Sequence, residues 1–365
     1  MQFRTKARAV DLLGKGQIAD LPTAITELWK NGYDAYADNL NAALFKEGFE
    51  ELKKSYFILS DDGKGMSSTD ILDKWLVLGT DSKSRAEMDI ESEETLWKRP
   101  RIKAGEKGIG RLSVAYLGNP MLMLTKRIGY PLQALYFDWR LLENYNLFLD
   151  DINIPLKSVA NLASLESVFN DLKKDFLSNF DKEFDLDDKP IWEGKQIELK
   201  DEIINNTREA LLETSILKNI FSIFNTRDSH GTLFLTFNPI EQILELSEKD
   251  EERIDDKEFI LSSLFGFTND FKDHKKDIQV SLKVFDDDNQ NYELLNSAGS
   301  FFNANDYNFA DVIIDGNFDG NGNFMGNLQI FDEVVDYSFS SIRSKNKNNY
   351  YGPCRIKLGY SQGFQ

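Results

Sequence analysis

Two glycine-rich turns constrain most strongly how this chain can fold. The first, DDGKGM (Asp61–Met66), follows the apolar run YFILS, and the second, GEKGIG (Gly105–Gly110), opens the apolar stretch RLSVAYLG. Glycine permits backbone conformations and close approaches that a side chain forbids. A strand that runs into the first turn and a helix that starts from the second therefore predict a fold of strands and helices with bare backbone available to a ligand.

The first turn has an ordinary alternative. Asp-Gly turns are common in β-hairpins, so this motif alone favours a hairpin. A carboxylate beside glycines also lets a flat heterocycle approach the backbone, while Asp61 accepts a hydrogen bond from an exocyclic amine.

The second turn has the spacing Gly-x-x-Gly-x-Gly, with glycines at 105, 108 and 110. Glycine-rich backbone at the start of a helix favours an anion, because unpaired N–H groups and the helix dipole both attract phosphate. The turn is not a P-loop, since the Gly-Lys-Ser/Thr ending is absent. It is not a Rossmann fingerprint either, because the spacing differs and a polar segment, not a strand, precedes it.

A polar stripe lies on the helix predicted over residues 20–46. In ELWKNGYDAYAD, Glu27, Asn31 and Asp34 stand at i, i+4 and i+7 and share one face. A carboxylate can take a proton from water, and an asparagine oxygen is a ligand that Mg²⁺ accepts. Taken alone, the stripe favours a solvated helix face.

The 365 residues predict two domains. We expect the first to span 1–258, with a highly charged helical insertion near 140–230. Between Gly79 and Lys103 the sequence is polar and too long for a plain connection, and such segments are often lids. Beyond 259, strand-like runs such as FADVIID and GNLQIFD alternate with Asn, Asp and Gly turns, so residues 259–365 predict a β-rich domain.

Composition excludes several classes of protein. The formal net charge of -18 is a poor footprint for nucleic acid, which needs clustered cations. The single cysteine, Cys354, excludes an internal disulfide and fits a reducing cytoplasm. The N-terminus lacks a signal-peptide apolar region, and no apolar run reaches the roughly 18 residues of a membrane span. His230, His274 and Cys354 make a poor zinc set.

The motifs gain weight from their order. HGTLFLTF places Thr232 at the start of a strand, which by itself reflects only β-propensity. Together, Glu-x-x-x-Asn-x-x-Asp-Ala, Asp-x-Gly-x-Gly, a long polar segment, Gly-x-x-Gly-x-Gly and Gly-Thr span about residues 27–232. This set resembles the GHKL ATPase superfamily, which includes gyrase B, the ninety-kilodalton heat-shock chaperones, histidine kinases, MutL and the MORC proteins. The resemblance implies an α+β Bergerat fold, with helices on one face of a mixed, mostly antiparallel sheet and ATP between helices and lid.

The resemblance also implies roles for single residues. Glu27 would be the general base that activates water, Asn31 would coordinate Mg²⁺, and Asp61 would bind the adenine amino group. For Lys83 in GTDSKS, a phosphate contact and a solvated lysine are equal alternatives. The other positions would line the nucleotide: Asp34 at the pocket floor, Gly63, Gly65 and Met66 around the adenine, Gly105, Gly108 and Gly110 with Lys107 at the phosphates, and Thr232 beside the adenine.

The branch of the superfamily follows from what flanks the motifs. No histidine precedes Glu27, which disfavours a histidine kinase, whereas LGTDSKS and the β-rich second domain resemble MORC and chaperone-type members. That branch implies Mg²⁺-dependent ATP hydrolysis, lid closure and an ATP-gated homodimer, with a protein or nucleic-acid client reached through other domains. The alternative is a nucleotide-gated binding module in which hydrolysis is incidental. A degenerate, nucleotide-free pocket is disfavoured because Glu27 and Asn31 are both present.

Two stretches of the second domain have competing interpretations. Arg343, Lys345 and Lys347 in SIRSKNKNNYYGP could supply a cation to the γ-phosphate, but a flexible polar loop is favoured. IDGNFDGNGNF mimics the start of an EF-hand loop, but Gly326 replaces the acidic twelfth residue, which favours a hairpin turn. The sequence ends with GPCRIKLGYSQGFQ, as expected of an N-terminal piece of a longer protein.

Overall fold

A computed structural model of the chain describes residues 4–14, 18–77, 91–101, 110–185, 188–247, 254–265, 278–286, 291–295, 309–340 and 353–361. The chain divides into two compact units, one of residues 1–268 and 276–297 and the other of residues 269–275 and 298–365. This division lies later than the boundary at 258–259 that the sequence suggested, because two strands beyond residue 259 extend the first sheet.

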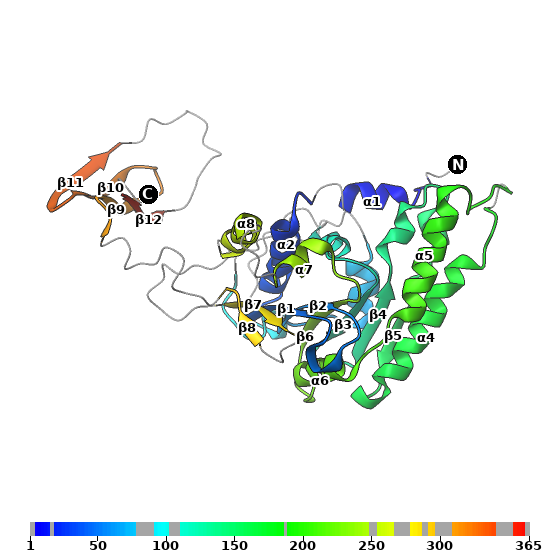
Figure 1. Cartoon of the computed structure of the whole chain (residues 1–365). Helices are drawn as coiled ribbons and strands as arrows, with labels where there is room; N and C mark the ends of the chain where they lie inside the picture. The colour runs from blue at the N-terminus through cyan, green and yellow to red at the C-terminus, as the bar shows by residue number, and fades with distance from the viewer. Residues whose placement is uncertain are drawn as a thin grey trace. The chain divides into compact units, whose positions relative to one another are not determined.

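The first unit is built on an eight-stranded sheet with the order β5-β4-β3-β6-β2-β1-β7-β8 (Figure 1). All its neighbouring strands are antiparallel except β1 and β7, which pair in parallel. The mixed, mostly antiparallel sheet predicted from the sequence is thereby confirmed. Its strands are β1 Asn39–Phe45, β2 Tyr56–Asp61, β3 Met121–Lys126, β4 Leu132–Phe137, β5 Leu156–Val159, β6 Gly231–Thr236, β7 Gln279–Phe285 and β8 Asn291–Glu293.

The helices and short helical turns of the first unit precede β1 or lie between these strands in the sequence. After β2, a short α-helix, Ser68–Asp70, continues as the π-helical turn Ile71–Trp75. The α-helices are α1 Arg8–Gly14, α2 Leu21–Asp34, α3 Ser68–Asp70, α4 Leu165–Leu177, α5 Lys195–Glu209, α6 Thr214–Ile223, α7 Glu241–Glu245 and α8 Ile254–Phe265. The short turns are η2 Phe49–Glu51, η3 Ile71–Trp75, η4 Glu93–Thr95, η5 Gly110–Tyr116, η6 Trp139–Glu143, η7 Leu149–Asp151, η8 Leu162–Ser164 and η9 Ser178–Phe180.

Helix α2 is shorter than the helix predicted over 20–46. It starts at Asp20, whose Oδ1 accepts from the Thr23 amide at 2.8 Å, an N-cap that satisfies a free N–H. It ends at Asp34, where Tyr36 adopts a left-handed conformation and the Ala37 amide donates to the Gly32 carbonyl. This is a Schellman closure without the usual glycine. The residues after it form β1 instead of further helix.

Helices cover both faces of the sheet, not one face as the resemblance implied, because the inserted helices pack on the face opposite α2. Along β4 and β2, side chains alternate between the faces, so Tyr136 and Asp61 point to opposite sides. Gly32 of α2 packs over Asp61, whereas Tyr136 packs against α4 and its hydroxyl meets Thr207 of α5 at 3.1 Å. The helical insertion predicted near 140–230 therefore covers the face opposite α2 and also contributes the edge strand β5 (Figure 1).

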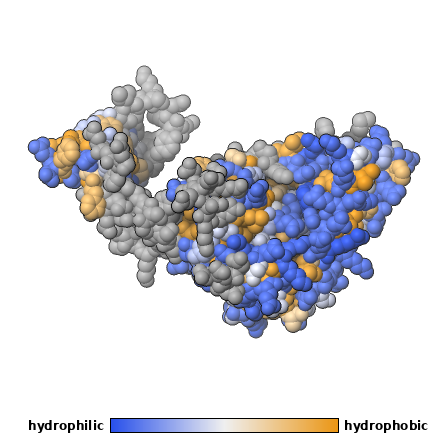
Figure 2. Space-filling model, viewed as in Figure 1, coloured by the Kyte–Doolittle hydropathy of each residue, from blue (hydrophilic) through white to orange (hydrophobic). Residues whose placement is uncertain are grey.

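The second unit is a four-stranded antiparallel sheet with the order β11-β10-β9-β12. β9 and β10 form a hairpin whose turn carries Asp319, so the hairpin preferred over an EF-hand loop is confirmed. The register places an apolar row on one face, while Arg355 and Lys357 lie on the other. Figure 2 shows hydrophobic residues at the surface of this unit in orange. Its strands are β9 Val312–Phe318, β10 Phe324–Ile330, β11 Glu333–Phe339 and β12 Cys354–Tyr360.

Within the described part of the chain, none of the helices has the length and apolar character needed to cross a membrane.

Candidate functional site

A row of side chains crosses the sheet on the face that α2 covers. Thr125 of β3 lies opposite Thr232 of β6, Thr232 opposite Asp61 of β2, and Asp61 opposite Leu40 of β1. The two threonine hydroxyls are 3.0 Å apart, and Thr232 is almost fully buried. Antiparallel pairing thus brings the ends of three strands from distant parts of the sequence to one spot.

Asp61 is the only charged member of this row. Its Oδ1 accepts from the Gly63 amide at 2.8 Å, while part of its surface remains accessible. Burial raises the pKa of Asp61 to about 7 and the neighbouring charge of Asp62 adds to this, against the lowering effect of backbone N–H groups from Gly63 and Thr232. The ionised form of Asp61 is therefore costly in the ligand-free protein, and a neutral donor that hydrogen-bonds to this carboxylate would offset part of that cost.

The adjacent Asp62 uses both carboxylate oxygens for hydrogen bonds within the protein. Its Oδ1 accepts from the amides of Asp38 and Asn39 at 2.7 and 2.8 Å, and its Oδ2 accepts from the Asn39 side chain. It holds the start of β1 against the end of β2. Of the two aspartates in DDGKGM, only Asp61 is free to face a ligand from the sheet.

Helix α2 reaches the row through its glycine. A Cβ added at Gly32 would lie 2.6 Å from Leu40 Cδ2 and 3.0 Å from Asp61 Cβ, so the helix backbone rests directly on the two strands. Asn31 and Glu27 follow on the same helix, one and roughly two turns before its end. The sequence stripe is therefore placed beside Asp61 by close packing at a position where no larger residue fits.

Gly110, the last glycine of the second turn, meets the stripe. A Cβ there would lie 2.7 Å from Glu27 Oε2 and 3.8 Å from Asn31 Nδ2. The other oxygen of the Glu27 carboxylate, Oε1, accepts from Lys30 at 2.7 Å. One carboxylate oxygen is thus engaged by an ammonium group, and the second faces the glycine backbone at the start of η5.

The β2 loop, defined as residues 62–67, is fixed on three sides. The Lys64 amide donates to the Ala35 carbonyl at 2.8 Å, and the Met66 amide donates to Thr125 Oγ1 at 2.9 Å. Gly65 has a φ of +65°, and a Cβ there would come 1.9 Å from the Lys126 carbonyl oxygen. The loop can take this path only with glycine at position 65.

The structure adds to the site two residues, Thr125 and His230, that none of the sequence motifs marked as site residues. Thr125 accepts from Met66 and contacts Thr232, and the His230 ring Nδ1 lies 2.8 Å from the Gly63 carbonyl. The position of His230 directly before Gly-Thr was a signal that could have marked it. Thr125 lies inside an apolar strand run, and its role depends on pairing that no local pattern reveals.

The structure brings together most of the predicted set. Glu27, Asn31, Asp61, Gly63, Gly65, Met66, Gly110 and Thr232 lie around the end of α2 and β2. Asp34 is the last residue of α2 and half-buried, and its part in the site stays a prediction. Seven predicted positions lie outside the described residues: Lys83, Gly105, Lys107, Gly108, Arg343, Lys345 and Lys347.

The donors at the site suit a shared metal ion better than a protein cage. Across the described ranges there is no group of three or more His, Cys, Asp or Glu that could hold a metal. The Asn31 amide and the Glu27 carboxylate provide at most a few oxygen ligands beside Gly110. Mg²⁺ keeps several waters and takes its remaining ligands from substrate phosphates and one or two protein oxygens, which fits this donor set.

One comparison with known proteins, the match to a family model, agrees with this arrangement. Residues 19–168 match the family model described as "Histidine kinase-, DNA gyrase B-, and HSP90-like ATPase". No curated protein matches the chain. Among solved structures, the crystal structure of the N-terminal domain of a DNA repair protein is similar over 88% of this chain and 69% of its own, with 12% identity and a TM-score of 0.37.

Proposed function

We propose that this chain, which belongs through residues 19–168 to the histidine kinase-, DNA gyrase B- and HSP90-like ATPase family, binds ATP and hydrolyses it slowly at the site between α2 and the β2 loop. One observation carries the proposal. Gly110 lies next to the side chains of Glu27 and Asn31, and the helix that bears these two residues packs on the row of sheet residues that contains Asp61. These groups lie together in space although the chain between them is long.

The two ends of the site would act on different parts of ATP. Asp61, with part of its surface accessible, accepts a hydrogen bond from the adenine amino group, and Thr232 and Thr125 place hydroxyls next to it. Glu27 acts at the other end, where Oε2 takes a proton from the attacking water. Backbone at Gly110 can approach a phosphate closely because no side chain intervenes.

Asn31 is the residue that would hold Mg²⁺, with Glu27 near by. When bound, the ion supplies charge neutralisation to the phosphates. The chain's own contribution is to fix the Asn31 amide on a helix whose position is set by the contact of Gly32 with Asp61.

A pair of variants tests the catalytic assignment. Glu27→Gln keeps the shape but cannot accept the proton, so we expect ATP affinity within a few-fold of wild type and a turnover rate lower by about 10²–10⁴-fold. Gly110→Ala places a methyl group 2.7 Å from Glu27 Oε2, the end of a flexible side chain, so the chain should fold and lose turnover.

Gly320→Ala is the matched control, because a Cβ there has nothing within 4 Å. Turnover is measured as phosphate release, and affinity by calorimetry with ATP and Mg²⁺. Undiminished turnover in Glu27→Gln would exclude Glu27 as the base, and a wild-type chain that binds no ATP would exclude the proposed function.

One contact favours a second candidate, a nucleotide-gated module in which hydrolysis is incidental. Lys30 holds Glu27 Oε1 at 2.7 Å, so this oxygen is already engaged and is not placed to receive a proton from an attacking water. In this case ATP would shift a conformational equilibrium, with lid closure and homodimerisation as the proposed response. Family resemblance supports these two features. Light scattering of Glu27→Gln with ATP and with ADP separates the candidates, because gating survives the loss of turnover.

A further inference from the structure

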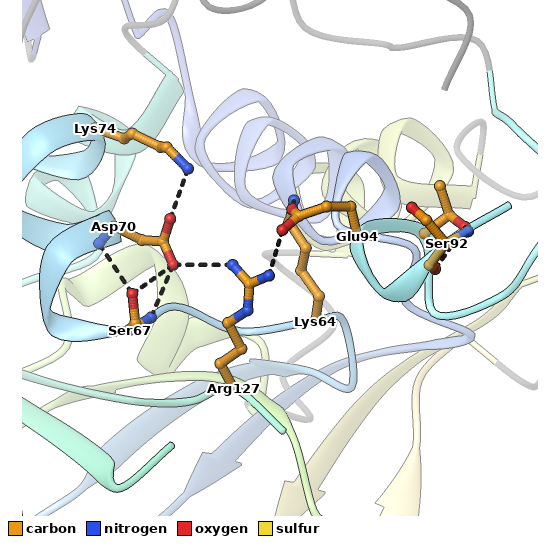
Figure 3. Close-up of polar contacts among 8 residues, drawn as sticks. Lys64, Ser67, Asp70, Lys74, Ser92, Glu94 and Arg127 are labelled. Carbon is orange, nitrogen blue, oxygen red and sulfur yellow. Dashed lines mark hydrogen bonds and ion pairs between the residues drawn. The ribbon is translucent and has the colours of Figure 1, made fainter. Parts of the chain in front are cut away.

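The end of strand β3 holds the β2 loop at three successive residues. Thr125 Oγ1 accepts from the Met66 amide at 2.9 Å, and the Lys126 carbonyl lies against the backbone of Gly65. The third residue, Arg127, acts at a longer range. Its guanidinium reaches two carboxylates, one on α3 and one on η4, and each of these in turn holds a residue of the loop (Figure 3).

The arrangement has two arms. The first arm runs from Arg127 through Asp70 to Ser67, and the second runs from Arg127 through Glu94 to Lys64. Arg127 Nη1 donates to Asp70 Oδ2 at 3.2 Å, and the same oxygen accepts from the Ser67 amide at 3.1 Å and from its hydroxyl at 2.7 Å. Arg127 Nη2 donates to the Glu94 carboxylate, which also accepts from Lys64 Nζ at 2.8 Å. One guanidinium is thereby linked to the middle and to the end of the β2 loop.

Burial strengthens the first arm more than the second. The side chains of Arg127 and Asp70 are 16% and 13% exposed, whereas that of Glu94 is 53% exposed. Burial acts to raise the pKa of Asp70, but hydrogen bonds from Lys74 and Ser67 outweigh it and hold that pKa well below its usual range. Asp70 therefore stays ionised at neutral pH, and its pair with Arg127 is weakly screened by salt.

We propose that Arg127 is a positioning residue for the adenine end of the ATP site. It acts through Asp70 and Glu94, and it sets the β2 loop, which carries Gly63 and Gly65, against Asp61. A site is precise when the groups around it are themselves held by their neighbours, so loss of the bridge should loosen the loop without touching the phosphate end. The role of Arg127 toward nucleotide rests on the proposed function.

Removal of Arg127 leaves both carboxylates paired. Asp70 keeps Lys74 at 2.6 Å, and Glu94 keeps Lys64 at 2.8 Å, so Arg127→Ala strands no buried charge and should fold. Arg127→Lys keeps the charge but replaces the planar fork with a single ammonium, which cannot reproduce both bonds. Arg355→Ala is the matched control, since Arg355 makes a similar two-nitrogen pair with Asp315 in the second unit.

All measurements use the chain of residues 1–365. We expect Arg127→Ala to weaken ATP binding by about tenfold in calorimetry, with Arg127→Lys between it and wild type and Arg355→Ala unchanged. Turnover at saturating ATP should stay at the wild-type value, so the effect appears in KM alone. Amide hydrogen exchange without nucleotide should speed up in the peptide that covers Gly63 to Ser67 and stay constant in strand β6.

The results separate two claims, that Arg127 holds the β2 loop and that the chain binds ATP. Wild-type exchange in the β2 loop or wild-type ATP affinity in Arg127→Ala would overturn the proposal, as would a fall in turnover at saturating ATP with an unchanged KM. If the wild-type chain binds no ATP, the proposed function and the nucleotide role of Arg127 both fail. If wild type binds ATP and Asp61→Asn does not, while Arg127→Ala binds normally, only the role of Arg127 fails.

Discussion

The Asp61 carboxylate, which is proposed to bind adenine, also lowers the stability of the ligand-free protein when it is ionised. Its folded-state pKa of about 7 lies above the ordinary value of 3.8, mainly because of burial. The folded chain therefore binds this proton more tightly than the unfolded chain does. The stability contributed by the protonated form is complete below about pH 4 and is lost as the pH rises through 7. Above pH 7 the ligand-free protein bears the full cost of the ionised group.

This predicts an unusual phenotype for Asp61→Asn. The variant should lose ATP binding, because the amide no longer offers a carboxylate to the adenine amine, yet it keeps an oxygen for the Gly63 amide. Its free energy of unfolding should match wild type near pH 4. At pH 8 it should exceed wild type by about 1–2 kcal/mol. This is less than the roughly 4 kcal/mol that three pKa units would give at about 1.4 kcal/mol each, because part of the Asp61 surface is accessible to solvent. Urea unfolding at both pH values and calorimetry with ATP check this, and a variant less stable than wild type at pH 8 contradicts it.

At the scale of elements, helix propensity favours alanine over glycine at position 32, whereas the packing of α2 against the sheet requires glycine there. Replacement of a helical glycine by alanine normally stabilises a helix by about 1 kcal/mol. Here the added Cβ would lie 2.6 Å from Leu40 and 3.0 Å from the Asp61 Cβ, and the second atom is close to the sheet backbone and cannot swing away.

We therefore expect Gly32→Ala to destabilise the chain by about 1–3 kcal/mol, as overpacking does, despite its better helix propensity. Because α2 would be pushed off Asp61, ATP affinity should fall as well. Urea unfolding and ATP calorimetry on the same preparation measure both effects. An Ala variant as stable as wild type would mean that α2 can shift on the sheet without cost.

The sequence predicted the site motifs better than the elements that carry them. Glu27, Asn31 and Asp61 were recognisable because their chemistry is tied to short spacings and to the glycines beside them. Strand β1 was missed because α2 closes at Tyr36, in a left-handed conformation without glycine or proline to mark it. The run NLNAALF then continues an apolar pattern that suits either a helix or a strand.

Local sequence patterns could not predict contacts between residues on neighbouring strands. Thr125 stands in MLMLTKR as one polar residue in an apolar run, and Arg127 as one of two basic residues at its end. Their roles arise only when β3 pairs with β6 and brings this end of the strand beside the β2 loop. No propensity or spacing encodes that register, because it is fixed by the burial of both sheet faces.

At the scale of the whole chain, β7 decides where the first unit ends. It pairs in parallel with β1 along its full length, and Phe285 stacks on Phe45 with ring centroids 4.3 Å apart and meets Phe49 at 5.3 Å. The sequence predicted a boundary at 258–259 because strand-like runs begin there. It did not show that one of these strands pairs in parallel with β1, which lies far away in the sequence. A fragment cut at 258 would leave β1 as an exposed edge.

We therefore expect a fragment of residues 1–297 to fold cooperatively and a fragment of residues 1–258 to aggregate or unfold. The longer fragment keeps β7, β8 and α8, and it should retain ATP affinity because Glu27, Asp61 and Thr232 all lie within its sheet and helices. Size-exclusion chromatography, urea unfolding and ATP calorimetry compare the two fragments with the full chain. A fragment of residues 1–258 that is monomeric, unfolds cooperatively and binds ATP as well as the longer one would show that β7 is dispensable to the first sheet.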